Sequence, residues 1–143
     1  MYGRRPLRPF AALLRGCHTM GVEKLLHVSV LVPDLGRALK FYQEILGLPL
    51  DPTRPEFGFP GAWLDVGDRQ IHLLQLQNPD PVTGRPEHGG RDRHIAFSVA
   101  ELETLRLALE QAGIPYTWSR SGRQAIFCRD PDGNALEFSQ AAG

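Results

Sequence analysis

The chain has 143 residues, of which 42% are hydrophobic and 22% are charged, a composition typical of one globular domain. Sixteen acidic residues cancel sixteen basic ones, so no overall field favours binding to nucleic acid or to an anionic membrane. No apolar run approaches the ~20 residues that cross a bilayer. The two cysteines, Cys17 and Cys128, form no CxxC pair, which excludes a thiolate zinc motif and favours a cytoplasmic protein.

Residues 1–20 differ from the rest of the chain because they contain several arginines and no acidic residue. An upstream start codon or a cloning leader, with the natural start at Met20, is the favoured interpretation. A mitochondrial transit peptide is the alternative, since such peptides are rich in arginine and poor in acids. The apolar stretch 10–14 is too short for a secretory signal. We expect residues 1–20 to lie outside the domain and residues 21–143 to form it.

The sequence that begins at His27 is repeated from His94. HVSVLVPDLGRALKFYQEILGLPL and HIAFSVAELETLRLALEQAGIPYT each begin as an alternating strand, continue into an amphipathic helix and stop at a glycine. After its glycine each copy resumes as an extended segment, at 48–50 or 114–116, and further strands are predicted at 63–66 and 70–76 in the first copy and at 124–128 and 135–139 in the second. The unit is therefore βαβββ, written twice, at about residues 23–77 and 91–140. Residues 78–90, rich in proline and glycine, are the predicted linker.

Both predicted helices have local support. In the first, Asp34 can cap the N-terminus, Gly47 can take the left-handed position after the last turn, and apolar residues between them recur at helical spacing. In the second, Glu103 suits the positive end of the helix dipole and Gly113 ends the apolar stripe.

Strand alternation places a histidine on the less apolar face of the first strand in each copy. Side chains at i and i+2 share a face, so His27 lies with Ser29, and His94 lies with Ser98. The opposite faces are uniformly apolar and are expected to pack on the helices.

The last strand of each copy carries a potential ligand at a matched position. His72 and Glu137 stand at the same offset from Asp65 and Asp130, and each shares its strand face with other polar or small residues. If a pseudo-twofold axis relates the copies, four equivalent strands bring His27, His72, His94 and Glu137 together around one point.

Taken singly, each of these residues has an ordinary structural explanation, such as a hydrogen-bonded histidine or a surface carboxylate. Their coincidence at matched positions predicts one divalent metal ion held by His27, His72, His94 and Glu137, because a cation compensates a buried carboxylate. The ligand types leave Ni, Co, Zn, Mn and Fe open. Of the other histidines, His18 lies in the leader and His88 is expected in a solvated linker.

The segments LLHVSVLVPDLGRALKFYQEILGL, DRHIAFSV and RDPDGNALEF resemble the vicinal oxygen chelate (VOC) superfamily, which includes glyoxalase I, methylmalonyl-CoA epimerase, fosfomycin-resistance enzymes, extradiol dioxygenases and bleomycin-resistance proteins. The resemblance spans about residues 23–140. It implies an α+β fold in which two βαβββ modules form a curled mixed sheet around a metal, commonly in a homodimer. By resemblance, His27, His94 and Glu137 match the family's ligands. His72 matches a fourth position that is Glu in glyoxalase I and Gln in the epimerase.

The resemblance leaves three functions open. The first is a metal-dependent isomerase or lyase, or an enzyme adding a thiol or water, acting on a small substrate chelated through two oxygens, with Glu137 as the catalytic proton carrier. The second is an Fe(II) dioxygenase, and the third is a binding protein that sequesters a ligand without catalysis. Ser29, Ser98 and Arg123 are the predicted substrate contacts. Other residues expected near the rim are Arg91, Arg93, Arg120, Tyr116 and Trp118.

Overall fold

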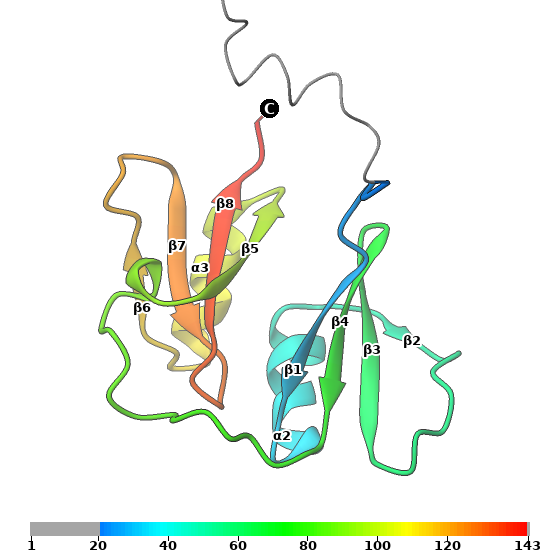
Figure 1. The fold of residues 1–143 in the computed structure, drawn as a ribbon. Helices are drawn as coiled ribbons and strands as arrows, with labels where there is room; N and C mark the ends of the chain where they lie inside the picture. The colour runs from blue at the N-terminus through cyan, green and yellow to red at the C-terminus, as the bar shows by residue number, and fades with distance from the viewer. Residues whose placement is uncertain (1–20, 143) are drawn as a thin grey trace, which may run out of the picture.

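Two four-stranded sheets, each with one helical segment beside it, make up residues 21–142, the part of the chain that the computed structural model describes (Figure 1). The predicted leader 1–20 lies outside these residues. The first module contains β1 (His27–Leu31), α2 (Leu35–Leu39), the π-helix η2 (Lys40–Ile45), β2 (Leu50–Asp51), β3 (Gly61–Val66) and β4 (Arg69–Leu74). The second contains the 3-10 turn η3 (Gly89–Arg91), β5 (His94–Val99), α3 (Leu102–Gln111), β6 (Tyr116–Trp118), β7 (Ala125–Arg129) and β8 (Ala135–Gln140).

The sheets confirm the predicted repeat strand by strand. Their orders are β1-β4-β3-β2 and β5-β8-β7-β6, and in each the first strand runs parallel to the last while the other pairs are antiparallel. The registers also match: Ser29 and Trp63 flank His72, just as Ala96 and Phe127 flank Glu137. The equivalence of His72 and Glu137 inferred from the sequence is therefore a structural one.

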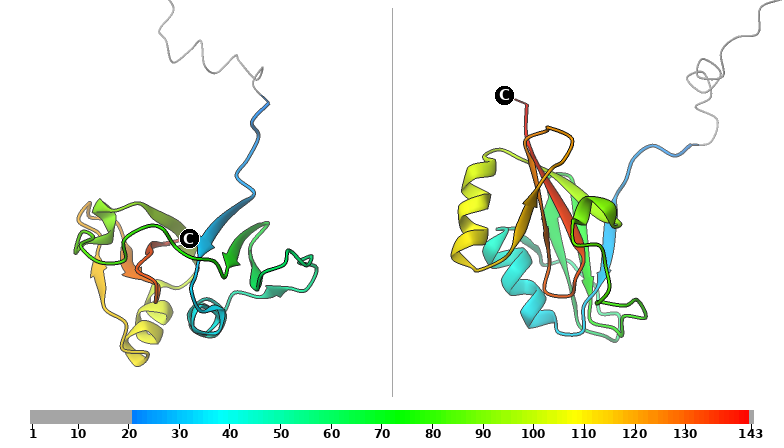
Figure 2. Two further views of the ribbon diagram at one scale, coloured as in Figure 1. Left: turned by 60° about the horizontal axis from the view of Figure 1, so that its bottom comes forward. Right: turned by 90° about the vertical axis from the view of Figure 1, so that its left-hand side faces the viewer.

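The apolar faces of both sheets contribute to one continuous hydrophobic core. Val30 and Val32 in the first module and Ile126 and Leu136 in the second belong to the same buried cluster. The two helical segments lie on the same side of the molecule (Figure 2). Burial of this shared apolar surface, at roughly 25 cal/mol per Å², is the principal force holding the modules together.

The first helix departs from the continuous α-helix that its apolar spacing predicts. After Leu39 the chain winds as a π-helix, so the amide of Leu46 donates to the carbonyl of Phe41 at 3.0 Å. The wider turn accompanies the burial of two consecutive aromatic residues, Phe41 and Tyr42, which are 2% and 0% exposed. Packing against the second module has thus overridden the local helical period.

The DPDGN turn before β8 joins the second module to the first helix. The hydroxyl of Tyr42 donates to Oδ2 of Asp130 at 2.6 Å, and Arg37 pairs with Asp132 at 2.5 Å. Both carboxylates are buried, at 5% exposure each. Gly133 has a φ of +84°, which its lack of a side chain allows. The motif that carries the family resemblance is therefore a structural clamp between modules.

No helix within residues 21–142 is long and apolar enough to cross a membrane.

Candidate metal centre

The histidine pair of the first module lies in a stack of aromatic rings. The His27 and His72 rings stack with centroids 3.9 Å apart, and the Trp63 ring lies 4.5 Å from the other face of His72. Adjacent strands β1, β4 and β3 supply the three rings, because the ladder places Trp63 opposite His72 and places His27 two positions away, opposite Gln70. His72 is consequently only 9% exposed. Burial, followed by the positive charges of His27 and Arg54, lowers the pKa of His72 below its ordinary 6.5 and favours the neutral imidazole that binds metals.

Gln70 fixes which nitrogen of His72 is free. The side-chain amide of Gln70 donates to Oδ2 of Asp51 at 2.7 Å and to Oδ1 of Asp65 at 2.9 Å. Its oxygen must then accept, and it lies 2.8 Å from Nε2 of His72. Nε2 therefore carries the proton, and Nδ1 keeps the lone pair that a metal ligand needs.

The pair in the second module faces across a short gap. Nε2 of His94 lies 3.1 Å from Oε2 of Glu137, and Glu137 is only 4% exposed. Nδ1 of His94 lies 2.9 Å from the carbonyl oxygen of Asp92, which can only accept, so Nδ1 carries a proton. In the neutral imidazole, the lone pair of Nε2 then points at a carboxylate oxygen. A proton on Nε2 or a cation bound by both atoms removes this repulsion.

The other oxygen of Glu137 has separate partners. Arg123 donates to Oε1 at 2.6 Å, and the hydroxyl of Ser139 lies 3.3 Å from the same atom. Arg123 is itself 62% exposed in its side chain. Because Arg123 and Ser139 occupy Oε1, Oε2 stays directed at His94.

The donor set fits a divalent metal ion. Two donors that each lie ~2.1 Å from one ion at right angles are ~3.0 Å apart, close to the 3.1 Å between His94 and Glu137. Nδ1–H of His94 donates a hydrogen bond to the Asp92 carbonyl, and a backbone carbonyl commonly accepts this bond from a metal-bound histidine. His94 and Glu137 thus match two adjacent positions of one coordination sphere.

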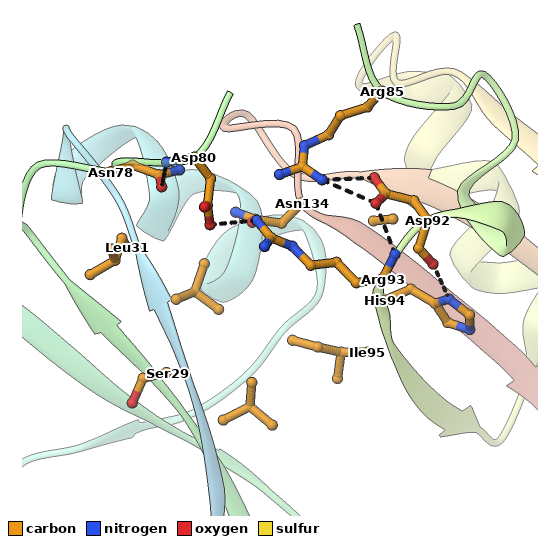
Figure 3. Close-up of a pocket in the computed structure, with 13 residues that line it drawn as sticks. Ser29, Leu31, Asn78, Asp80, Arg85, Asp92, Arg93, His94, Ile95 and Asn134 are labelled. Atoms are coloured by element: carbon orange, nitrogen blue, oxygen red, sulfur yellow. Dashed lines mark hydrogen bonds and ion pairs between the residues drawn. The ribbon is translucent and has the colours of Figure 1, made fainter. Parts of the chain in front are cut away.

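The single chain does not gather all four predicted ligands. Within residues 21–142, no three His, Cys, Asp or Glu side chains lie close enough together to hold one metal ion. In Figure 3, Ser29, which shares a strand face with His27, points away from β5, and the ring of His94 points away from β1. The cleft between these strands, about 400 Å³, is lined by Val28, Val30 and Ile95, together with Ser29 and His94. Within residues 21–142 the His27–His72 pair and the His94–Glu137 pair are therefore separate, and they are called the two half-sites below.

The predicted substrate contacts divide between different surfaces. Ser29 lines a cavity of about 280 Å³ beside His27 and His72, and Arg123 bonds to Glu137. Ser98 lines an apolar groove between η2 and α3 instead.

Several residues near the half-sites were not anticipated from the sequence. His88 is 6% exposed rather than solvated, because its Nδ1 lies 2.7 Å from the Thr117 hydroxyl and its ring packs on Phe127. Gln70 orients His72 and Trp63 stacks on its ring. The sequence predicted only that both residues lie in strands. Their positions on the face of His72 follow from the same alternation, so the sequence held a signal for both.

Comparisons with known proteins identify the family of the chain. The model of the "Glyoxalase/Bleomycin resistance protein/Dioxygenase superfamily" matches residues 24–138. The Arabidopsis thaliana protein "Glyoxylase I 4" is 35% identical over 124 residues, covering 82% of this chain and 70% of its own. "Glutathione transferase FosA" of Serratia marcescens is 33% identical over 120 residues, covering 82% and 80%.

The fold has the same relatives. The crystal structure of a glyoxalase family protein from Bacillus anthracis has a TM-score of 0.69 and 26% identity, and the match covers 85% of this chain and 97% of that one. With the family model spanning nearly all of residues 21–142, this chain belongs to the glyoxalase, bleomycin resistance and dioxygenase superfamily, the vicinal oxygen chelate proteins.

Proposed function

We propose that the protein is a divalent-metal-dependent VOC enzyme that isomerises, cleaves or adds a thiol or water to a small substrate bound through two adjacent oxygens. The observation that supports this most directly is the pair of lone-pair donors, His94 Nε2 and Glu137 Oε2, aimed at each other across 3.1 Å. Relatives named for glyoxalase and glutathione transferase activities support the same class of reaction. When bound, the metal would stabilise the negative charge that develops on the substrate oxygens.

The contacts support a separate role for each residue of the proposed site. His27, His72 through Nδ1, His94 through Nε2 and Glu137 through Oε2 would hold the metal. Glu137 would dissociate transiently and then accept a substrate proton at Oε2, since Arg123 and Ser139 keep hold of Oε1 while that happens. Ser29 is placed to contact the substrate beside the first pair.

A second copy of the chain would complete each site. The ligand-bearing faces of β1 and β5 point apart within one chain (Figure 3). The opposite, apolar faces of both sheets contribute to the shared core. In a homodimer, the first module of one copy can face the second module of the other. Two equivalent sites would result, each with His27 and His72 from one subunit and His94 and Glu137 from its partner.

Subunit complementation tests this arrangement. H27A and E137Q proteins, each inactive alone, are co-expressed with different tags and the mixed dimer is purified. A site shared between subunits regains up to half of the wild-type activity, because one of the two sites contains all four ligands. The shared site would be contradicted if the mixed dimer has no activity and binds no metal.

Metal analysis followed by a substrate panel tests the function itself. Purified protein is stripped with a chelator, reloaded with Ni, Co, Zn, Mn or Fe, and assayed with methylglyoxal plus glutathione, fosfomycin plus glutathione, and catechols. We expect stoichiometric metal and activity restored by Ni or Co. Ring cleavage of a catechol with Fe alone would assign a dioxygenase, and chelator-insensitive ligand binding by a metal-free protein would assign a binding protein.

A further inference from the structure

A small cavity on the first module has an aromatic floor and one arginine. It measures about 280 Å³ and is lined by His27, Ser29, Arg54, Phe57, Phe59, Trp63, His72 and Leu74. The rings form a series: Phe59 stacks near Phe57 at 6.0 Å, and Phe57 lies 6.2 Å from Trp63, which stacks on His72. The cavity is at the lower end of the volumes that hold small ligands, which suits one ring with a short substituent.

Arg54 is held in this cavity by its surroundings. Its guanidinium lies 5.0 Å from the centre of the Phe57 ring and 5.5 Å from that of Phe59, and Nη2 donates to the Phe59 carbonyl at 3.0 Å. A Cβ on Gly61 would lie 2.5 Å from the Leu73 carbonyl oxygen and 2.7 Å from Nη2 of Arg54, so the glycine lets both the neighbouring strand and the guanidinium approach closely. The loop between β2 and β3 contains Pro52, Pro55 and Pro60, which restrict its backbone.

The charge of Arg54 has no partner within residues 21–142. None of the ion pairs in this part of the chain involves Arg54, and its one hydrogen bond is to a neutral carbonyl. Arg123 at the other half-site, in contrast, is already paired with Glu137. A positioned guanidinium without an acid, in a cavity open to the substrate, is a site for an anionic group.

We infer that this cavity is the specificity subsite for the substrate's side chain, and that it takes a flat aromatic group bearing a carboxylate. The ring would lie against Trp63 and Phe57, and the carboxylate would pair with Arg54. Because His27 and His72 line the same cavity, this inference rests on the proposed function and names the class of substrate that the metal site would receive.

Three matched small molecules test the recognition of the aromatic ring and of the carboxylate separately. Phenylacetate carries both features, cyclohexylacetate lacks the aromatic ring, and phenylacetamide lacks the charge. A carboxylate can itself coordinate a metal ion, so binding is measured on metal-free protein. Isothermal titration calorimetry measures the affinities, because it needs no tryptophan and therefore applies equally to the variants at Trp63.

We expect phenylacetate to bind roughly 10-fold more tightly than either analogue, the ratio that one aromatic stacking contact or one charge-assisted hydrogen bond supplies. R54Q should abolish the preference over phenylacetamide, and W63L should abolish the preference over cyclohexylacetate. W63F keeps a ring and should retain that preference. R106Q, an arginine on α3 away from the cavity, is the matched control and should change neither ratio.

Equal affinity for the three ligands, or an R54Q protein that still prefers the carboxylate, would overturn the inference. Metal titration of the same samples keeps the two proposals apart. Metal binding without any ligand preference refutes the subsite alone, whereas ligand preference without metal binding refutes the proposed function.

Discussion

The two modules have the same strand order and register, yet their matched ligand positions have different surroundings. In the first, His72 is sandwiched between two rings and its tautomer is set by a glutamine. In the second, Glu137 faces a histidine and is held by an arginine. A duplicated fold thus supplies equivalent positions, and the side chains around them decide which half orients a neutral ligand and which half carries the negative charge.

Removal of Glu137 is expected to have the largest effect. E137Q keeps the shape of the side chain but removes the half-site's only negative charge. Affinity for Co(II) should therefore fall at least ~100-fold, because the loss of a group that only hydrogen-bonds to a metal ligand can already lower metal affinity by that factor. H72Q should reduce the affinity only about 10-fold, because three ligands remain. Competition titration against a chromogenic chelator measures both. A larger loss for H72Q than for E137Q would reverse the roles assigned to the modules.

Asp92 supports the second half-site, and its removal is expected to cost stability. Its carboxylate bonds to Arg129 at 2.8 Å and to Arg85 at 3.0 Å, and its backbone carbonyl orients His94. D92N should lower the free energy of unfolding at pH 7 by about 2 kcal/mol, the range of hydrogen bonds to charged groups. Urea unfolding monitored by circular dichroism measures the difference.

The cost of D92N should also depend on pH. The hydrogen bond from Arg129, first among several contacts, lowers the pKa of Asp92 in the folded protein. A depressed pKa gives stability that is complete above the unfolded value of ~3.9 and is lost as the pH falls through the native value. The difference between wild type and D92N should therefore be constant above about pH 5 and shrink below about pH 4. A difference that grows on acidification would contradict this assignment.

Gln70 orients His72 in the first half-site, as the backbone carbonyl of Asp92 orients His94 in the second. Q70L removes the acceptor for Nε2 of His72 and frees the ring to adopt the other tautomer. We expect Co(II) affinity to fall about 10-fold, as it does when other groups that hydrogen-bond to a metal-bound histidine are removed. Nitrogen chemical shifts of His72, which distinguish the tautomers, should change in Q70L but not in S139A, whose hydroxyl contacts Glu137. Unchanged shifts in Q70L would show that another contact sets the tautomer.

The clamp between the modules gives the smallest predicted effect. Y42F removes the hydrogen bond to Asp130, but the carboxylate keeps bonds from Asn134 and Asp132, so the cost should be about 1 kcal/mol. Burial, followed by the negative charge of Asp130, raises the pKa of Tyr42 well above 10.0 and keeps the hydroxyl a donor. Thermal unfolding measures the loss. Metal affinity should not change in Y42F, because neither half-site contacts the ring.

Much of the fold could be predicted because its signals are local. Alternation in HVSVLV and HIAFSV assigned the faces of β1 and β5, and the internal repeat identified His72 and Glu137 as equivalent. The same alternation placed Gln70 beside His72 without revealing the bond between them. The π-turn at 40–45 escaped prediction, since it depends on contacts that Phe41 and Tyr42 make with residues far along the chain.

The sequence by itself determined the two modules, the candidate ligand residues and the strand face that carries each of them, because the alternation of a strand can be read from neighbouring residues. Only the tertiary structure decided that the two ligand-bearing faces point apart, that Gln70 and Asp92 set the histidine tautomers, and that Arg54 has no acidic partner within residues 21–142. These features arise from packing between segments that are distant in sequence, where the shared core fixes the directions that local periodicity leaves free.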